Sequence, residues 1–204
     1  ASRRVLGIDF PRGRDLGPIL AAWLVSLGVL IFQRDLGSSL LFFGLFVVML
    51  YVATERPGWL VVGTTLFLGG ALFAATTFSH VQSRVDAWLS PFPVTDGTFQ
   101  LTQGLYGMAW GGLLGRGLGE GNPYLTPFAY SDFIFASFAE ELGLAGAMAI
   151  LLMYGLIVER GLRIALLCRD AFGKLLATGL AVSFALQVFV VVGGVTRLIP
   201  LTGL

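Results

Sequence analysis

The chain has 204 residues, of which 56% are hydrophobic and only 12% are charged, with a formal net charge of +1. Soluble domains carry roughly 25% charged residues, so this composition and a mean hydropathy of +0.84 indicate a membrane protein. The charges fall in short clusters between apolar runs and form no nucleic-acid footprint. The single cysteine, Cys168, excludes an internal disulfide, and the single histidine, His80, excludes a cluster of histidine ligands.

Five apolar segments reach or approach the length of about 20 residues that a helix needs to cross the hydrocarbon. These predicted membrane helices cover residues 17–32, 36–53, 59–78, 132–158 and 175–193. Charged residues at 33–35 and a charged turn with helix-breaking residues at 54–58 separate the early segments, and a basic loop at 159–174 is expected before the last one. We therefore expect residues 1–204 to form one membrane domain, an all-α polytopic bundle of about five transmembrane helices.

The long polar and glycine-rich region at 79–131 is expected to carry helices of its own. Residues 82–89 place apolar side chains at helical spacing, which predicts a helix on the membrane surface that Pro91 and Pro93 end. Residues 99–114 are moderately apolar and predict a second helix, either interfacial or partly buried in the protein. Glycines within it permit close approach to neighbouring helices.

The orientation follows from the Lys and Arg residues on alternate sides of the predicted spans. One side carries Arg3, Arg4, Arg12, Arg14, Arg56, Arg160, Arg163, Arg169 and Lys174, and the other carries Arg34, Arg84, Arg116 and Arg197. The positive-inside rule then places residues 1–16 and 159–174 in the cytoplasm and 79–131 outside. Asp132 is therefore expected at the outer membrane surface.

Three carboxylates, Asp132, Glu140 and Glu141, stand at the mouth of the fourth apolar segment. A carboxylate at the edge of a membrane helix suggests a function, but Asp132 at a helix start could equally cap free N–H groups. Glu140 lies eight residues further on, about 12 Å along a helix axis. At least one residue of the Glu140–Glu141 pair should face protein or water, because an ionised group in hydrocarbon costs several kcal/mol.

The glycine-rich run at 111–121 lacks the Gly-Lys-Ser/Thr ending and the preceding strand of a phosphate loop. We therefore favour turns and close packing for these glycines, with backbone presentation of N–H groups to an anion as the second reading. Arg84 and Arg116 are cations on the outer side, where contact with lipid headgroups competes with substrate binding. Glu120 could pair with Arg116 as an exposed ion pair of little value.

Several motifs occur in an order that points to one family. They are 33–40 (QRDLGSSL), 84–91 (RVDAWLSP), Gln100 with Gln103, 111–119 (GGLLGRGLG) and 131–146 (SDFIFASFAEELGLAG). Over essentially its whole length the chain resembles the SEDS family of RodA, FtsW and SpoVE. It departs from the family pattern at Arg34, where a proline is usual, and it ends where the family continues into two further helices.

The resemblance implies a central part of a ten-helix protein in the bacterial cytoplasmic membrane. Such proteins are peptidoglycan glycosyltransferases that polymerise lipid II with a class B penicillin-binding protein and other elongation or division proteins. The family's essential acidic residue falls on Asp132, which would act as general base. A divalent cation, Mg²⁺ or Mn²⁺, could assist with Asp132 or a glutamate as ligand. The isolated chain is not expected to catalyse the reaction alone.

The substrate-binding residues are less constrained by these motifs. Arg84 and Arg116 are candidates to offset charge on the leaving diphosphate, and Gln103 and Glu140 are expected to support the same site. An apolar groove between helices would hold the polyprenyl tail. Two alternatives stay open: a lipid II flippase that uses Asp132 or Glu140, and a scaffold for the penicillin-binding protein. The motifs are shared by elongation, division and sporulation proteins.

Overall fold

The computed structural model describes residues 3–5, 8–10, 17, 21, 24, 25, 28 and 36–201. Two three-residue strands come first and pair antiparallel, β1 (Arg3–Val5) and β2 (Ile8–Phe10). The long helices are α2 (Leu36–Thr54), α3 (Gly58–Thr77), α6 (Ile134–Leu167) and α7 (Ala171–Val195). Between α3 and α6 lie α4 (Ser79–Leu89), α5 (Phe99–Gly111) and the 3-10 turn η1 (Pro123–Leu125).

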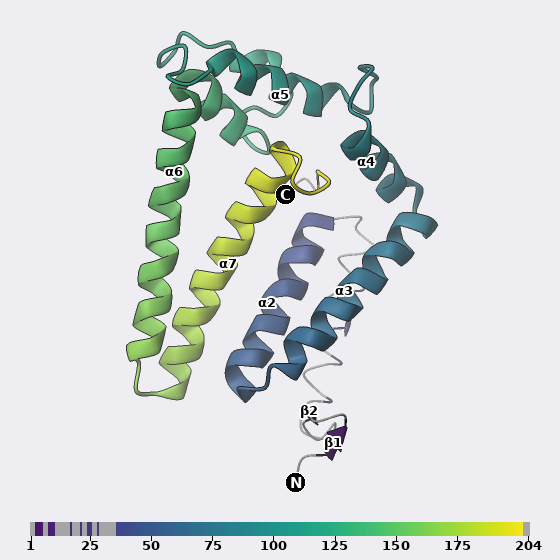
Figure 1. Ribbon diagram of the computed structural model, residues 1–204, viewed down its shortest axis with the longest axis vertical. Coiled ribbons are helices and arrows are strands. Elements are labelled where there is room, and N and C mark those ends of the chain that lie inside the picture. The colour runs from purple at the N-terminus through teal and green to yellow at the C-terminus, as the bar shows by residue number, and fades with distance from the viewer. Residues whose placement is uncertain are drawn as a thin grey trace.

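The four long helices form a row in the order α6, α7, α2, α3, while α4 and α5 lie across one end (Figure 1). The turns α2–α3 and α6–α7 lie at the opposite end. The predicted helical bundle is thus confirmed, with the small β1–β2 hairpin as an unpredicted addition. The helix predicted at 17–32 falls outside the described residues except at five isolated positions, and the turn at 33–35 falls outside them entirely.

All four long helices are long and apolar enough to cross a membrane. Large apolar side chains stand exposed along them, for example Leu66, Leu72 and Phe73 on α3 and Leu152 on α6. In water such surfaces would be unfavourable, whereas lipid chains can cover them, and the helices satisfy their own backbone hydrogen bonds. The chain is therefore part of a multi-pass membrane protein.

Small residues set the close contacts between neighbouring helices. A Cβ atom on Gly63 of α3 would lie 2.5 Å from the Val47 side chain of α2. A Cβ atom on Gly161 of α6 would lie 2.9 Å from Cβ of Ala181 on α7. Glycine and alanine at these crossings let the helices approach closely, which provides the van der Waals contact that drives association in lipid.

The prediction of a basic loop at 159–174 is wrong for most of these residues. Residues 159–167 continue α6, and only 168–170 form the turn to α7. Charged residues suggested a loop, but on a helix Glu159 can pair with Arg163 one turn later, as it does here. Asp170 then caps α7 by accepting a hydrogen bond from Gly173 N. The basic cluster still lies at one end of the bundle.

Helix α4 is tied to the segment that follows α7. The Trp88 Nε1–H donates to the carbonyl of Arg197 at 2.9 Å, and Arg197 Nε donates back to the carbonyl of Trp88 at 3.2 Å. One turn away, Arg84 Nη1 donates to the carbonyl of Leu201 at 3.2 Å. The surface helix predicted at 82–89 is therefore confirmed as a helix, but protein contacts fix its position.

The helix predicted at 99–114 is also present, as α5. It ends at Gly111 and buries Leu101, Thr102 and Gly104.

The two ends of the bundle can be assigned to membrane sides by thiol labelling, because Cys168 is the chain's only cysteine and lies in the α6–α7 turn. We expect a membrane-impermeant maleimide to leave Cys168 unlabelled in intact spheroplasts. It should label a cysteine placed at the exposed Glu120 in a Cys168→Ser background of the full-length protein, with other cysteines removed. The reverse pattern would contradict the charge-based orientation.

Candidate functional site

Helix α6 is broken near its start, at Gly143. This residue has φ 70° and ψ −174°, so residues 134–142 and 144–167 form two helical pieces joined by a kink. In an unbroken helix, the N–H groups of Leu144 and Ala145 would donate to the carbonyls of Glu140 and Glu141. The kink replaces these two bonds, so these two donors and two acceptors need other partners.

The glycine-rich loop after α5 supplies the missing backbone partners. Leu144 N donates to Gly112 O at 2.9 Å, and Ala145 N donates to Leu113 O at 3.1 Å. The carbonyls of Glu140 and Glu141 accept from Arg116 N at 3.1 Å and Gly117 N at 3.0 Å. These four groups are thus satisfied by one loop, and the N–H groups of Arg116 and Gly117 are not available to an anion.

Only glycine fits at the closest points of this contact. A Cβ atom on Gly115 would lie 2.1 Å from the Glu141 carbonyl oxygen, and one on Gly143 would lie 2.2 Å from Gly115 N. Both residues also have positive φ, 82° and 70°. A Cβ atom on Gly111 would lie 2.1 Å from the carbonyl oxygen of Ala139. The prediction that these glycines serve turns and close packing is confirmed.

A cavity of about 120 Å³ opens beside this contact, between α5, the loop and the first piece of α6. Its lining residues combine aromatic rings with amides, hydroxyls and one pair of opposite charges. They are Gln103, Tyr106, Gly107, Trp110, Arg116, Asn122, Leu125, Thr126 and Glu140. The cavity therefore brings together three of the predicted substrate-binding residues, Gln103, Arg116 and Glu140.

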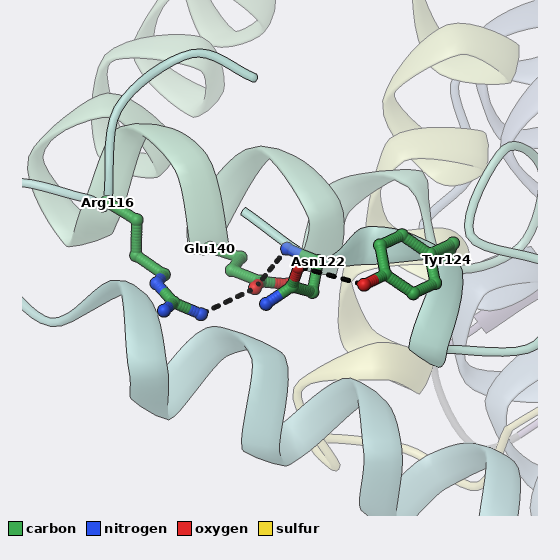
Figure 2. A network of polar contacts seen from close by, with 4 residues as sticks. All are labelled: Arg116, Asn122, Tyr124 and Glu140. Atoms are coloured by element: carbon green, nitrogen blue, oxygen red, sulfur yellow. Dashed lines mark hydrogen bonds and ion pairs between the residues drawn. The ribbon is translucent and has the colours of Figure 1, made fainter. Parts of the chain in front are cut away.

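Glu140 is the buried anion of the cavity wall, with 5% of its side chain exposed. Its Oε1 accepts a hydrogen bond from Asn122 N at 2.8 Å and lies 3.6 Å from Arg116 Nη1 (Figure 2). The guanidinium of Arg116 also lies over the Trp110 ring, 4.9 Å from its centroid, a cation–π arrangement. Arg116 thus pairs with Glu140 and not with Glu120, and the expectation that one of the two adjacent glutamates faces protein is confirmed.

Asp132 stands in the turn immediately before α6. It does not cap the helix, because the N-cap position is Phe133 and no side chain makes a capping bond there. Within the described part of the chain its carboxylate makes no hydrogen bond or ion pair, and its side chain is half-buried. Phe133 is fully buried against Gly104, where a Cβ atom would lie 2.5 Å from its ring. The backbone of Asp132 is therefore anchored by its neighbour.

The remaining predicted residues fall in different places. Asp132 does not line the cavity, and Arg84 lies away from it, bonded to the carbonyl of Leu201. Among the described residues, no three His, Cys, Asp or Glu side chains come together as a metal site. Asp132 offers a single carboxylate, which is too few for a resident metal site of protein ligands. Metal assistance stays a prediction.

Sequence reasoning missed Tyr106, Trp110, Asn122 and Thr126 as cavity residues. The two aromatic residues carried a signal, because Gln103, Tyr106 and Trp110 follow the i, i+3, i+7 spacing of one helix face. No sequence pattern marked Asn122 or Thr126 as a cavity residue. Their positions depend on the path of a loop that returns to α6 through backbone contacts.

Comparison with known proteins places this chain in a family. Residues 10–204 match the family model of FtsW, RodA and SpoVE, described as cell cycle protein. The chain belongs to the FtsW/RodA/SpoVE family. It is 54% identical over 205 residues to peptidoglycan glycosyltransferase RodA of Mycobacterium tuberculosis. It is 37% identical over 191 residues to the probable peptidoglycan glycosyltransferase FtsW of Geobacter metallireducens.

A sporulation protein is also among the relatives. Stage V sporulation protein E of Bacillus subtilis is 36% identical over 195 residues. The matches cover 100%, 92% and 93% of this chain in the order given. The chain spans about half the length of these curated relatives, 44% of the RodA protein and 51% of each of the other two. The family membership predicted from the motifs is confirmed.

The glycine contact predicts a graded set of stability changes. Gly143→Ala and Gly115→Ala each place a Cβ atom against backbone, whereas Gly119→Ala does not, although Gly119 also has positive φ, 78°. We expect Gly119→Ala to destabilise by about 1 kcal/mol through its backbone conformation alone. The other two should cost about 1–3 kcal/mol more because of the clash.

Thermal unfolding of the full-length protein in detergent would measure this difference, with Gly119→Ala as the matched control for backbone strain. Equal apparent Tm values for all three variants would show that the loop and the kinked helix are not in close contact.

Proposed function

We propose that the complete protein containing this chain is a peptidoglycan glycosyltransferase that polymerises lipid II, with Asp132 as general base. The observation that supports this most is that the Asp132 carboxylate makes no hydrogen bond or ion pair in the described chain. The buried neighbour Phe133 holds the backbone of Asp132 next to the helix bundle. A carboxylate that neither caps nor pairs is open to a substrate at the membrane edge.

In this reaction the Asp132 carboxylate accepts the proton of the acceptor hydroxyl. The 4-hydroxyl of the acceptor sugar attacks the anomeric carbon of a sugar carried on a lipid diphosphate. A new glycosidic C–O bond forms, and the bond from the anomeric carbon to the diphosphate oxygen breaks, with its electron pair leaving on the diphosphate. Asp132 accepts the hydroxyl proton, which is the task of a general base. On the charge-based orientation, Asp132 meets the lipid-linked sugar at the outer surface.

The flippase alternative is less well supported by the described spans. Carriers place polar or charged groups near the middle of the membrane, where the substrate site lies. Helices α2 and α3 contain no charged residue, and α7 contains only Lys174, in its first turn. In α6 no charged residue lies between Glu141 and Glu159. These described helices therefore offer no charged site at mid-depth.

The partner is proposed to be a class B penicillin-binding protein, as the family membership suggests. Glycan polymerisation and peptide cross-linking act on the same strand, so one complex keeps the new strand close to the second active site. Activity is best assayed on the full-length protein together with this partner, because this chain spans only 44% of the RodA relative.

Replacement of the proposed base provides the direct test. We expect Asp132→Asn to lower the rate of polymerisation of fluorescent lipid II by about 10²–10⁴-fold, the usual contribution of a positioned base. Asp96→Asn is the matched control, because Asp96 is an exposed carboxylate in the same region between α3 and α6. It should leave the rate unchanged.

Co-purification of the Asp132→Asn variant with its partner would show that the fold is intact. Polymerisation by this variant at the normal rate would exclude Asp132 as the base. Lipid II transport in proteoliposomes without polymerisation by the unmodified complex would favour the flippase.

A further inference from the structure

We propose that the cavity bounded by Arg116 and Glu140 is a subsite for an uncharged sugar unit of the glycan, bearing hydroxyl and acetamido groups, and not a clamp for the diphosphate. This proposal rests on the proposed function, since it names the part of the substrate that the cavity holds. It also replaces the earlier hypothesis for Arg116, which assigned that cation to the leaving group.

The charge balance of the cavity favours a neutral ligand. Arg116 and Glu140 are the only charged residues among the described residues of its lining, and they lie 3.6 Å apart. Glu140 is almost fully buried, so its charge is weakly screened by water. A diphosphate bound to Arg116 would bring further negative charge beside this carboxylate and would compete for its partner cation. An uncharged ligand leaves the pair intact.

Several polar groups of the cavity have no hydrogen-bond partner in the described chain. The Gln103 amide offers donors and an acceptor, and the hydroxyls of Tyr106 and Thr126 offer both. Thr126 is buried, with 6% of its surface exposed, and it lines the cavity, where a ligand can supply a partner for its hydroxyl. Three neutral groups that can both donate and accept suit sugar hydroxyls and an amide.

The rest of the wall is apolar and aromatic. Trp110 and Tyr106 are 66% and 44% exposed, and Leu125 adds an aliphatic surface. A sugar ring has apolar C–H faces between its polar edges, which such a wall can contact. Mostly apolar walls with a few placed polar groups are typical of small-molecule sites.

The distance to Asp132 decides which sugar unit the cavity can hold. Glu140 lies six residues beyond Ile134, the first residue of α6, which is about 9 Å along the helix axis. Asp132 is not part of the cavity lining, so we assign the cavity to a sugar unit next to the one whose hydroxyl gives its proton to Asp132. Binding of this non-reacting unit orients the reacting sugar, a use of binding energy that raises the rate of the chemical step.

The proposal can be tested with a ligand that carries no phosphate. Chitotetraose, a tetramer of N-acetylglucosamine, would be titrated into the full-length protein in detergent, and binding would be followed by saturation-transfer NMR. We expect saturable binding that inorganic pyrophosphate does not displace. Thr126→Val keeps the side-chain shape and removes the hydroxyl, so it should weaken binding about 3- to 10-fold. Glu120→Gln, an exposed residue of the same loop, should have no effect.

A double-mutant cycle separates a neutral site from an anion clamp. Arg116→Gln and Glu140→Gln should each weaken chitotetraose binding about tenfold, because each leaves one charge unpaired in the wall. The double variant should recover to within about threefold of the unmodified protein. Displacement of chitotetraose by pyrophosphate, or a double variant no better than Arg116→Gln, would overturn the proposal.

The test of the sugar subsite is independent of the assignment of Asp132 as general base. Asp132→Asn should bind chitotetraose normally while it polymerises lipid II about 10²–10⁴-fold more slowly. Normal polymerisation by Asp132→Asn would exclude Asp132 as the general base but would not contradict the sugar subsite. If a complex that polymerises lipid II does not bind chitotetraose, the sugar subsite is contradicted and the proposed function is not.

Discussion

Four backbone hydrogen bonds join the glycine-rich loop to the kink of α6, at the end of the bundle where α4 and α5 lie. A helix cannot break in or near a membrane unless the freed N–H and C=O groups find new partners. Gly143 creates the break, and the loop residues Gly112, Leu113, Arg116 and Gly117 supply the partners. This exchange requires backbone-to-backbone contact, and therefore requires glycine at the closest points.

The positions of the functional side chains follow from this contact. Because Arg116 N bonds the carbonyl of Glu140, the side chains of these two residues leave neighbouring points of the backbone and meet in the cavity wall. The kink also turns the first piece of α6 onto α5, where Phe133 buries its ring against Gly104 and anchors Asp132. One backbone arrangement thus sets the distance between the proposed base and the proposed sugar subsite.

The sequence predicted the membrane helices well, because hydropathy decides them directly, as at 36–54 and 58–77. The sequence prediction failed at the charged end of α6, where Glu159 and Arg163 suggested a loop but lie within the helix, which continues to Leu167. The family resemblance singled out Asp132, whereas composition alone could not separate a base from a cap. The break at Gly143 and the cavity behind it depend on contacts distant in sequence, which no local pattern carries.

Residue-resolved amide hydrogen exchange on the full-length protein tests the central contact most directly. The amides of Arg116 and Gly117 donate to α6, whereas those of Leu118 and Gly119, in the same loop, make no backbone hydrogen bond in the described chain. The account predicts that the first pair exchanges at least about 100-fold more slowly than the second. Equal exchange rates for all four amides would contradict it.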